Sequence, residues 1–246
     1  MTPPRSFRSA ELQPGAVADA SGALWLPQSN CLVVADLHLG YAWVQRQRGL
    51  MLPVGTPDTT VERLVALQST YCPEAIVFLG DLVHAASGLE PLREHLSELT
   101  DVLAPKSRLI CLLGNHDRNL ARRVAEWSLP LELAARLRLG PFCLAHGDVL
   151  PEGGFSPDTI WVIGHEHPCI VMGDGTGNAL RVRCFLAGAT CLVLPAFSPW
   201  ASGCVVGQRP FLGPVAAAHS YDRVVACLGH RVLSVPTARL LGGGVG

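Results

Sequence analysis

Five short apolar runs, each ending in a cluster of glycine and polar residues, dominate the pattern along the chain. They cover residues 30–35, 75–79, 109–113, 142–145 and 161–163. Runs of this length without polar alternation are typical of strands that are covered on both faces of a sheet. We therefore predict five buried strands, each leading into a polar turn.

Segments with helical spacing separate the early strands. Apolar residues at positions 61, 64, 65 and 67 predict a helix that ends near Tyr71, and Thr56-Pro57 is a favourable start for it. Leucines at 89, 92, 96, 99 and 103 predict a second helix, and a third is expected from Asp117 or Asn119 through Trp127.

The second half of the chain is rich in strand-like runs. They follow one another, with turns between them, at 131–139, 141–145, 160–163, 169–172, 180–186, 190–194, 204–206, 223–228 and 231–236. A βαβα half followed by such a half predicts one α/β domain with two packed sheets. We expect it to span residues 1–241, with a flexible tail at 242–246.

Composition narrows the class of protein. The 246 residues are 49% hydrophobic and 16% charged, which is enough for a sizeable core. The net charge of -1 excludes a global basic field that would attract nucleic acid. We find neither an apolar leader nor a stretch long enough to span a membrane, so we expect a cytoplasmic protein. The nine scattered cysteines are expected to be buried thiols instead of disulfides or zinc ligands.

Eight polar residues follow the five apolar runs: Asp36, His38, Asp81, Asn115, His116, His146, His165 and His167. Open α/β sheets bind ligands at the carboxyl ends of their strands, so these side chains are expected to converge. Carboxylates, amides and imidazoles suit borderline or hard divalent ions. Each of these short motifs alone is more typical of a turn, but their recurrence after all five apolar runs favours a metal site. The ligands exceed the needs of one ion, and a carboxylate such as Asp81 could bridge two ions.

The same motifs resemble the signature of the calcineurin-like metallophosphoesterases. The resemblance rests on Asp36-x-His38, Gly80-Asp81, Gly114-Asn115-His116-Asp117, His146 and Gly164-His165-x-His167. Residues 36–40, 48–53, 194–197 and Ser202-Gly203 are most similar to the ligase-associated (PdeM-type) bacterial phosphoesterases and their archaeal relatives. The resemblance implies a four-layer αββα sandwich of two mixed sheets flanked by helices.

The resemblance also implies how two ions would share their ligands. One would take Asp36, His38, Asp81 and His167, and the other Asp81, Asn115, His146 and His165. The mixed donors suit manganese, which we expect, or iron or zinc. Asp148 and Glu166 are candidates to orient the imidazoles, although either could be a plain turn residue.

By the same resemblance, His116 would act on the scissile phosphate as acid or electrostatic stabiliser, with Asp117 fixing its tautomer. The alternative is that His116 is one more metal ligand. Many members of the family have an acidic residue where this chain has His84. That histidine could orient a ligand, contact the substrate or be an ordinary loop residue.

Arg46, Arg118 and Arg122 follow the motifs closely and could form a phosphate-binding rim. Tyr41 and Trp43 could stack on bases. The competing interpretation is that the arginines are solvated and the aromatic residues packed.

The resemblance implies a dinuclear phosphoesterase that hydrolyses phosphodiesters, with DNA as the candidate substrate. It would be an endo- or exonuclease in DNA repair, associated with a DNA ligase or helicase system. The alternatives are a small-molecule phosphodiesterase or phosphomonoesterase, and a non-catalytic metal-binding scaffold. The oligomeric state stays open.

Overall fold

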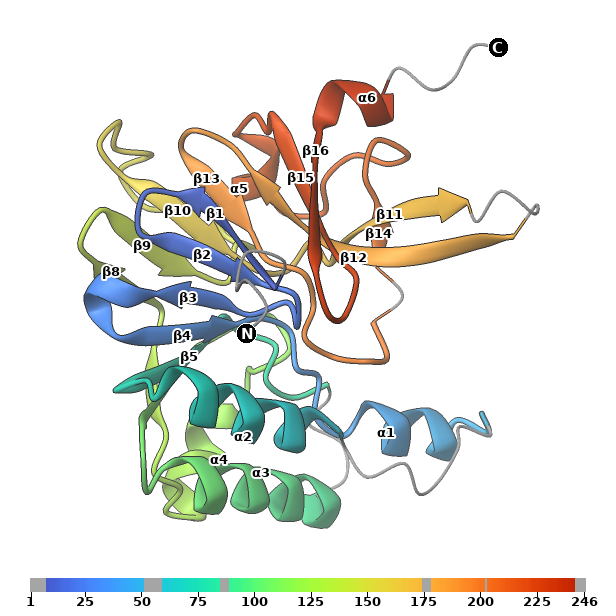
Figure 1. Cartoon of the computed structure of the whole chain (residues 1–246). Helices are drawn as coiled ribbons and strands as arrows, with labels where there is room; N and C mark the ends of the chain where they lie inside the picture. Colours follow the sequence, from blue (N-terminus) through green and yellow to red (C-terminus); the bar gives the residue numbers. More distant parts are fainter. Residues whose placement is uncertain (1–7, 51–58, 85–88, 174–177, 202, 242–246) are drawn as a thin grey trace, which may run out of the picture.

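The computed structural model describes residues 8–50, 59–84, 89–173, 178–201 and 203–241. The predicted helix start at Thr56-Pro57, Ser202 and the predicted tail at 242–246 lie outside these ranges. Within them the chain forms two β-sheets that pack face to face, with helices on the outer side of the first sheet (Figure 1).

The first sheet has seven strands. Their order across the sheet is β1 (Ser9–Gln13), β2 (Ala16–Asp19), β3 (Leu24–Leu26), β4 (Cys31–Val34), β5 (Ala75–Phe78), β6 (Arg108–Leu112) and β7 (Glu132–Ala134). Pairing is antiparallel from β1 to β4 and parallel from β4 to β7. The carboxyl ends of β4, β5 and β6 therefore meet at one edge.

The second sheet has nine strands. Its main path is β14 (Cys204–Val205), β11 (Pro168–Gly173), β12 (Ala179–Ala187), β13 (Cys191–Val193), β10 (Ile160–Ile163), β9 (Phe142–Ala145) and β8 (Arg136–Leu139). β15 (Arg223–Cys227) pairs with β12, and β16 (Val232–Pro236) pairs with β15. β9, β10 and β13 run parallel, so the ends of β9 and β10 point in the same direction.

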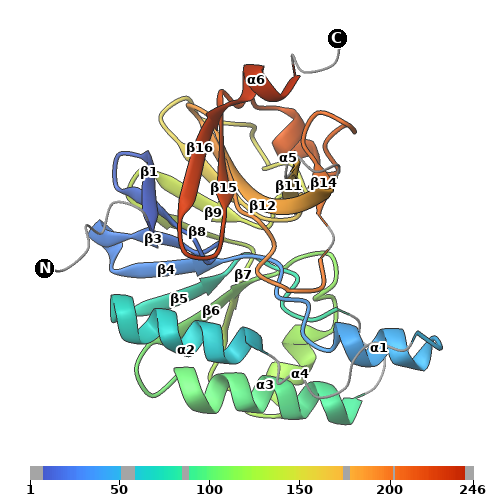
Figure 2. The ribbon, with the colours of Figure 1, turned by 45° about the vertical axis from the view of Figure 1, so that its right-hand side comes forward.

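Helices lie outside the sheets and between strands. They are α1 (Tyr41–Gln47), α2 (Thr59–Tyr71), α3 (Leu89–Leu103), α4 (Leu120–Glu126), α5 (Pro214–Ala217) and α6 (Thr237–Leu241), with a 3-10 turn at Pro27–Ser29. Figure 2 shows α2, α3 and α4 beneath the first sheet and α1 at its side. No helix in the described part of the chain is long and apolar enough to cross a membrane.

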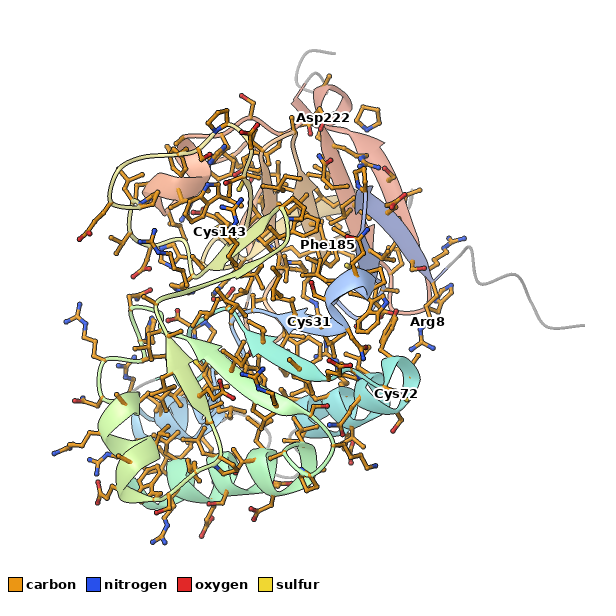
Figure 3. All side chains as sticks on the ribbon, turned by 90° about the vertical axis from the view of Figure 1, so that its left-hand side faces the viewer. Arg8, Cys31, Cys72, Cys143, Phe185 and Asp222 are labelled. Atoms are coloured by element: carbon orange, nitrogen blue, oxygen red, sulfur yellow. The ribbon has the colours of Figure 1, made fainter. Side chains whose placement is uncertain are left out.

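The apolar strands lack alternation because both faces are buried. In β5, Val77 belongs to the core between the sheets, whereas Ile76 and Phe78 belong to the core beneath the helices. Phe185 of β12, labelled in Figure 3, fills the same inter-sheet core as Val77. A third core covers the outer face of the second sheet and includes Val215 of α5. The predicted α/β class with two mixed sheets is confirmed. The helical layer on the outer face of the second sheet is small, because α5 has only four residues.

One predicted strand is wrong in a specific way. The run 131–139 forms two strands, β7 and β8, which lie in different sheets. β7 pairs with β6, and β8 pairs with β9, so the chain crosses from one sheet to the other at Ala135. No glycine or proline marks this crossing, and the apolar pattern continues through it.

Other elements were not predicted. β1, β2 and β3 are short strands with partly polar sequences, and α1 has only seven residues. The cysteines follow expectation, since seven of the nine are buried and Cys72, labelled in Figure 3, is exposed.

Candidate active site

The candidate ligands occupy the turns that follow five strands. Asp36 and His38 follow β4, Asp81 follows β5, and Asn115 follows β6. The second sheet supplies the remaining histidines after β9 and β10, namely His146, His165 and His167. The structure therefore brings together residues that are up to 131 positions apart in the chain.

Sharp backbone turns aim these side chains inward. Five candidate ligands have a positive φ: Asp36 (54°), His38 (49°), Asp81 (48°), His165 (69°) and His167 (47°). A left-handed conformation at a residue other than glycine costs on the order of 1–3 kcal/mol and is typical of functional sites. Hydrogen bonds between the turns offset this cost, since the His38 amide donates to the Asp81 carbonyl at 2.9 Å and the Asp36 amide to the Gly80 carbonyl at 3.3 Å.

Two glycines leave room for the ligands. A Cβ on Gly80 would lie 2.5 Å from His146 Nδ1, and a Cβ on Gly114 would lie 2.5 Å from Asp81 Oδ1. Gly80 also has a φ of +74°, which favours glycine in its own right. The glycines before Asp81 and Asn115 are therefore part of the site's geometry.

The ligand atoms gather in two groups that can each hold a metal ion. One contains Asp36, His38 and His167, and the other contains Asp81, His146 and His165; within each group the ligand atoms lie within 4.8 Å of one another. The family resemblance implies these two groups with Asp81 shared between them and Asn115 added to the second. Asn115 joins the second group, because its Oδ1 lies 3.2 Å from His146 Nε2.

Contacts within the groups have the chemistry of a cation site. Nε2 of His38 and Nε2 of His167 are 3.3 Å apart, and His167 Nε2 is also 3.3 Å from Asp36 Oδ1. In the second group, His165 Nδ1 is 3.1 Å from His146 Nε2. Imidazole lone pairs and carboxylate oxygens that converge in this way fit a divalent cation.

Burial and neighbouring charges set the protonation of these groups. Burial lowers the pKa of His38 to about 3, which leaves the imidazole neutral, as a metal ligand must be. Burial also lowers the pKa of His165, and His146 lowers it further. Burial works to raise the pKa of Asp36, but attraction to His167, His146 and His38 outweighs it, so the pKa is lowered. The pKa of Asp81 is raised by burial.

Backbone groups orient the imidazoles. His146 Nδ1 lies 2.8 Å from the Leu79 carbonyl, so Nδ1–H donates there and Nε2 is free to face the ligand group. Glu166, which we expected to orient an imidazole or to be a turn residue, has another role. Its buried carboxylate accepts hydrogen bonds from the amides of Leu212 and Gly213, at 2.8 and 2.6 Å, and so holds that loop against the site.

His116 lies beside the second ligand group. Its side chain is 38% exposed, its amide donates to Asp81 Oδ1 at 2.9 Å, and its Nε2 lies 3.9 Å from Asp81 Oδ2. The ring Nδ1 lies 2.7 Å from the His84 carbonyl oxygen and donates to it. Nε2 is consequently the ring nitrogen left to act in the site.

The expectation that Asp117 fixes the His116 tautomer is wrong, because the His84 carbonyl holds that position. The Asp117 carboxylate instead accepts the amides of Gly114, Leu82 and Val83, at 3.0, 3.4 and 3.2 Å. These bonds join the turn after β5 to the turn after β6. Burial raises the pKa of Asp117 to about 6.

His84 lies within the site, whereas no hydrogen bond or ring contact joins the three arginines to it in the described part of the chain. The His84 ring is stacked on His116 at a centroid distance of 5.5 Å, and its Nδ1 is a buried atom without a partner among the described residues. Arg46, Arg118 and Arg122 are exposed, and none makes an ion pair within the described part of the chain. Their role in a phosphate-binding rim stays a prediction.

Sequence reasoning missed two arginines that support the site. Arg63 donates from Nη1 to the Phe197 carbonyl and from Nη2 to the Ser21 carbonyl, both at 2.7 Å. Arg183 donates to the carbonyls of Ala196 and Phe197 at 3.2 and 3.3 Å. No motif marks either residue in the sequence, although both donate to the segment 194–197, which resembles the family.

Comparison with known proteins bears on the family and the fold of the chain. The family model for the calcineurin-like phosphoesterases matches residues 30–226. No curated protein matches the chain. A solved structure titled Pseudomonas putida nuclease MPE is similar at a TM-score of 0.66 and 23% identity, covering 94% of this chain and 100% of that one. Yfce, a phosphoesterase from E. coli, is similar at a TM-score of 0.42 and 16% identity, covering 84% and 98%.

Proposed function

This chain belongs to the calcineurin-like phosphoesterase family, and we propose that it hydrolyses phosphodiester bonds in DNA. The observation that carries the proposal is the pair of buried ligand groups with His116 beside them. The similar P. putida protein is described as a nuclease, which supports DNA as the phosphodiester substrate that we infer for this chain.

Both ligand groups fit divalent cations. We propose manganese, with iron or zinc as the alternatives, because the donors mix carboxylate, imidazole and amide groups. Asp36, His38 and His167 would hold one ion; Asp81, Asn115, His146 and His165 would hold the other, with Asp81 as the bridge. A pair of such ions supplies charge neutralisation for phosphoryl oxygens and activation of water.

The chain's own residues would then control the leaving group. His116 donates its Nδ1 proton to the His84 carbonyl, which fixes the ring with Nε2 toward the site. A proton held on Nε2 can pass to the leaving oxygen of the ester as the bond to phosphorus breaks. Asp117 acts at a distance from the ring by holding the turns that carry Asp81 and Asn115.

The resemblance to the ligase-associated phosphoesterases supports a proposal for the biological role of this chain. We infer a cytoplasmic nuclease in DNA repair that works beside a DNA ligase or helicase. A small-molecule phosphodiesterase or phosphomonoesterase would use the same site. A non-catalytic scaffold would be expected to have lost ligands, whereas all seven candidate ligands and His116 are retained here.

Hydrolysis of bis(p-nitrophenyl) phosphate with manganese, next to single-stranded and duplex DNA, tests the proposal. We expect turnover of the aryl diester and of DNA, abolished by chelator. Turnover of the small diester without cleavage of either DNA at low salt would refute the nuclease function. Failure to hydrolyse any ester in the presence of bound metal would favour the scaffold.

A further inference from the structure

Four aromatic rings form a continuous array that begins at the candidate active site. His116 is stacked on His84, and His84 meets the edge of Tyr41 at a centroid distance of 4.5 Å. Tyr41 is nearly parallel to Trp200, with an interplanar angle of 13° and a centroid distance of 6.4 Å. The array therefore extends from the proposed catalytic histidine to two large flat side chains.

The segment that carries Trp200 is fixed to the ligand turns at both ends. The Phe197 amide donates to the Ala35 carbonyl at 2.7 Å, and the Ser198 amide to the Asp36 carbonyl at 3.1 Å. Beyond Trp200, the Cys204 amide donates to the His167 carbonyl at 2.8 Å. Figure 2 shows the orange chain that follows residue 193 descending toward α1, the helix that carries Tyr41.

Arg63 reinforces this position. Its guanidinium lies 3.8 Å from the centroid of the Phe197 ring and donates to the Phe197 carbonyl. Arg183 donates to the same carbonyl from the second sheet. Both sheets therefore hold the segment that carries Trp200. Because this segment is already ordered, a ligand that binds the Trp200 ring loses little conformational entropy by ordering it.

Packing does not explain the two rings. Trp25, Trp127 and Trp161 all belong to the apolar cores or pack against them. Tyr41 and Trp200 belong to none of the cores in the described part of the chain, and both are partly exposed. An unburied tyrosine and tryptophan in parallel beside a phosphoester site are suited to a flat ligand.

Positive charge lies near the same array. Tyr41 is the first residue of α1 and Arg48 follows its last residue, so one short helix carries both the ring and the guanidinium. Arg48 is exposed at the end of α1. A nucleotide has both parts that such a surface would bind: a flat base that stacks on the aromatic rings and a phosphate that pairs with the guanidinium.

We propose that Tyr41 and Trp200 form a base-stacking platform next to the scissile phosphate, which makes single-stranded DNA the substrate. The inference rests on the proposed function and narrows it. In duplex DNA the faces of a base are covered by its neighbours, whereas an unpaired strand can place a base on an aromatic ring. Stacking tolerates every base, so the platform would select for strandedness without selecting for sequence.

Binding without cleavage tests the platform directly. The probe is a short fluorescent oligothymidylate, titrated with the full chain in EDTA, and compared with an abasic oligomer of equal length. Trp200→Ala and Tyr41→Ala are expected to raise the Kd for oligothymidylate about tenfold, with Trp200→Phe near wild type. The Kd for the abasic oligomer is expected to be the same in all of these proteins.

Trp43→Ala is the matched control. Trp43 is a partly exposed aromatic residue on α1 that has no ring contact in the part of the chain that the structure describes. Equal weakening for both oligomers, no weakening, or an equal effect of Trp43→Ala would overturn the platform.

Hydrolysis of bis(p-nitrophenyl) phosphate by the wild-type chain separates this inference from the proposed function. If hydrolysis fails, the phosphodiesterase function fails, and the binding titrations still decide the platform. If hydrolysis succeeds and the titrations show no dependence on bases, only the platform is wrong.

Discussion

A single methyl group added at Gly114 should disrupt the second ligand group while the fold survives. The new Cβ would lie 2.5 Å from Asp81 Oδ1, 2.6 Å from the Asp81 nitrogen and 2.9 Å from His146 Cδ2, whereas ordinary contacts begin at 3.4 Å. Asp81 would have to shift by almost an ångström, although its carbonyl is held by the His38 amide at 2.9 Å. A displacement of this size typically costs about a hundredfold in rate, and we expect metal affinity to fall about 10- to 100-fold.

The matched control is Gly173→Ala. Neither Gly114 nor Gly173 has a positive φ, but a Cβ on Gly173 would meet only the Asn178 carbonyl oxygen, at 3.9 Å. Calorimetric titration with Mn²⁺ and the kcat/KM for bis(p-nitrophenyl) phosphate would be measured for both variants, with urea unfolding as a check on the fold. Overpacking at Gly114 should lower the free energy of unfolding by about 1–3 kcal/mol. A Gly114→Ala protein that binds metal and turns over substrate like the control would refute the geometry described for Asp81.

Three further variants and one labelling experiment probe separate parts of the structure. Arg63→Met removes two hydrogen bonds from a charged group to backbone carbonyls, so urea unfolding should show a loss of about 2–4 kcal/mol. Arg108→Met breaks an exposed ion pair and should cost less than about 1 kcal/mol; equal losses would contradict the positioning role of Arg63. His116→Ala should lower diester turnover at least a hundredfold while calorimetry shows unchanged Mn²⁺ binding; loss of metal would make His116 a ligand. A thiol reagent should label Cys72 first in the native protein, and rapid labelling of the seven buried cysteines would contradict the packing of the cores.

The sequence predicts the strands at the centre of the fold well because both of their faces are buried. Such strands read as uninterrupted apolar runs, and β4, β5 and β6 lie where those runs are. The edge strands β1, β2 and β3 are short and partly polar, so nothing in their pattern separates them from loops. The run 131–139 divides at Ala135 because its two halves pair with strands of different sheets, and no residue in the local sequence marks this point.

The sequence predicts those residues of the candidate site whose side chains are typical metal ligands and which directly follow a predicted strand. Asp36 and His167 are 131 positions apart and follow strands of different sheets, β4 and β10. Parallel pairing aligns the strand ends within each sheet, and the packing of the two sheets brings the two sets of ends together. Contacts of backbone atoms were beyond prediction, since any residue offers a carbonyl. The His84 carbonyl therefore holds the His116 ring where a carboxylate, Asp117, had been expected. Trp43 and Tyr41 are equally plausible partners for a base in the sequence, and only the fold separates them.

The number of divalent ions per chain tests the dinuclear phosphoesterase most directly. Chelator-treated protein would be titrated with Mn²⁺ in a calorimeter while hydrolysis of bis(p-nitrophenyl) phosphate is followed at each ratio of metal to protein. We expect two ions per wild-type chain, one in His167→Ala and one in His165→Ala, with hydrolysis rising only as the second ion binds. A single ion per wild-type chain, or full turnover with one ion bound, would contradict the dinuclear centre.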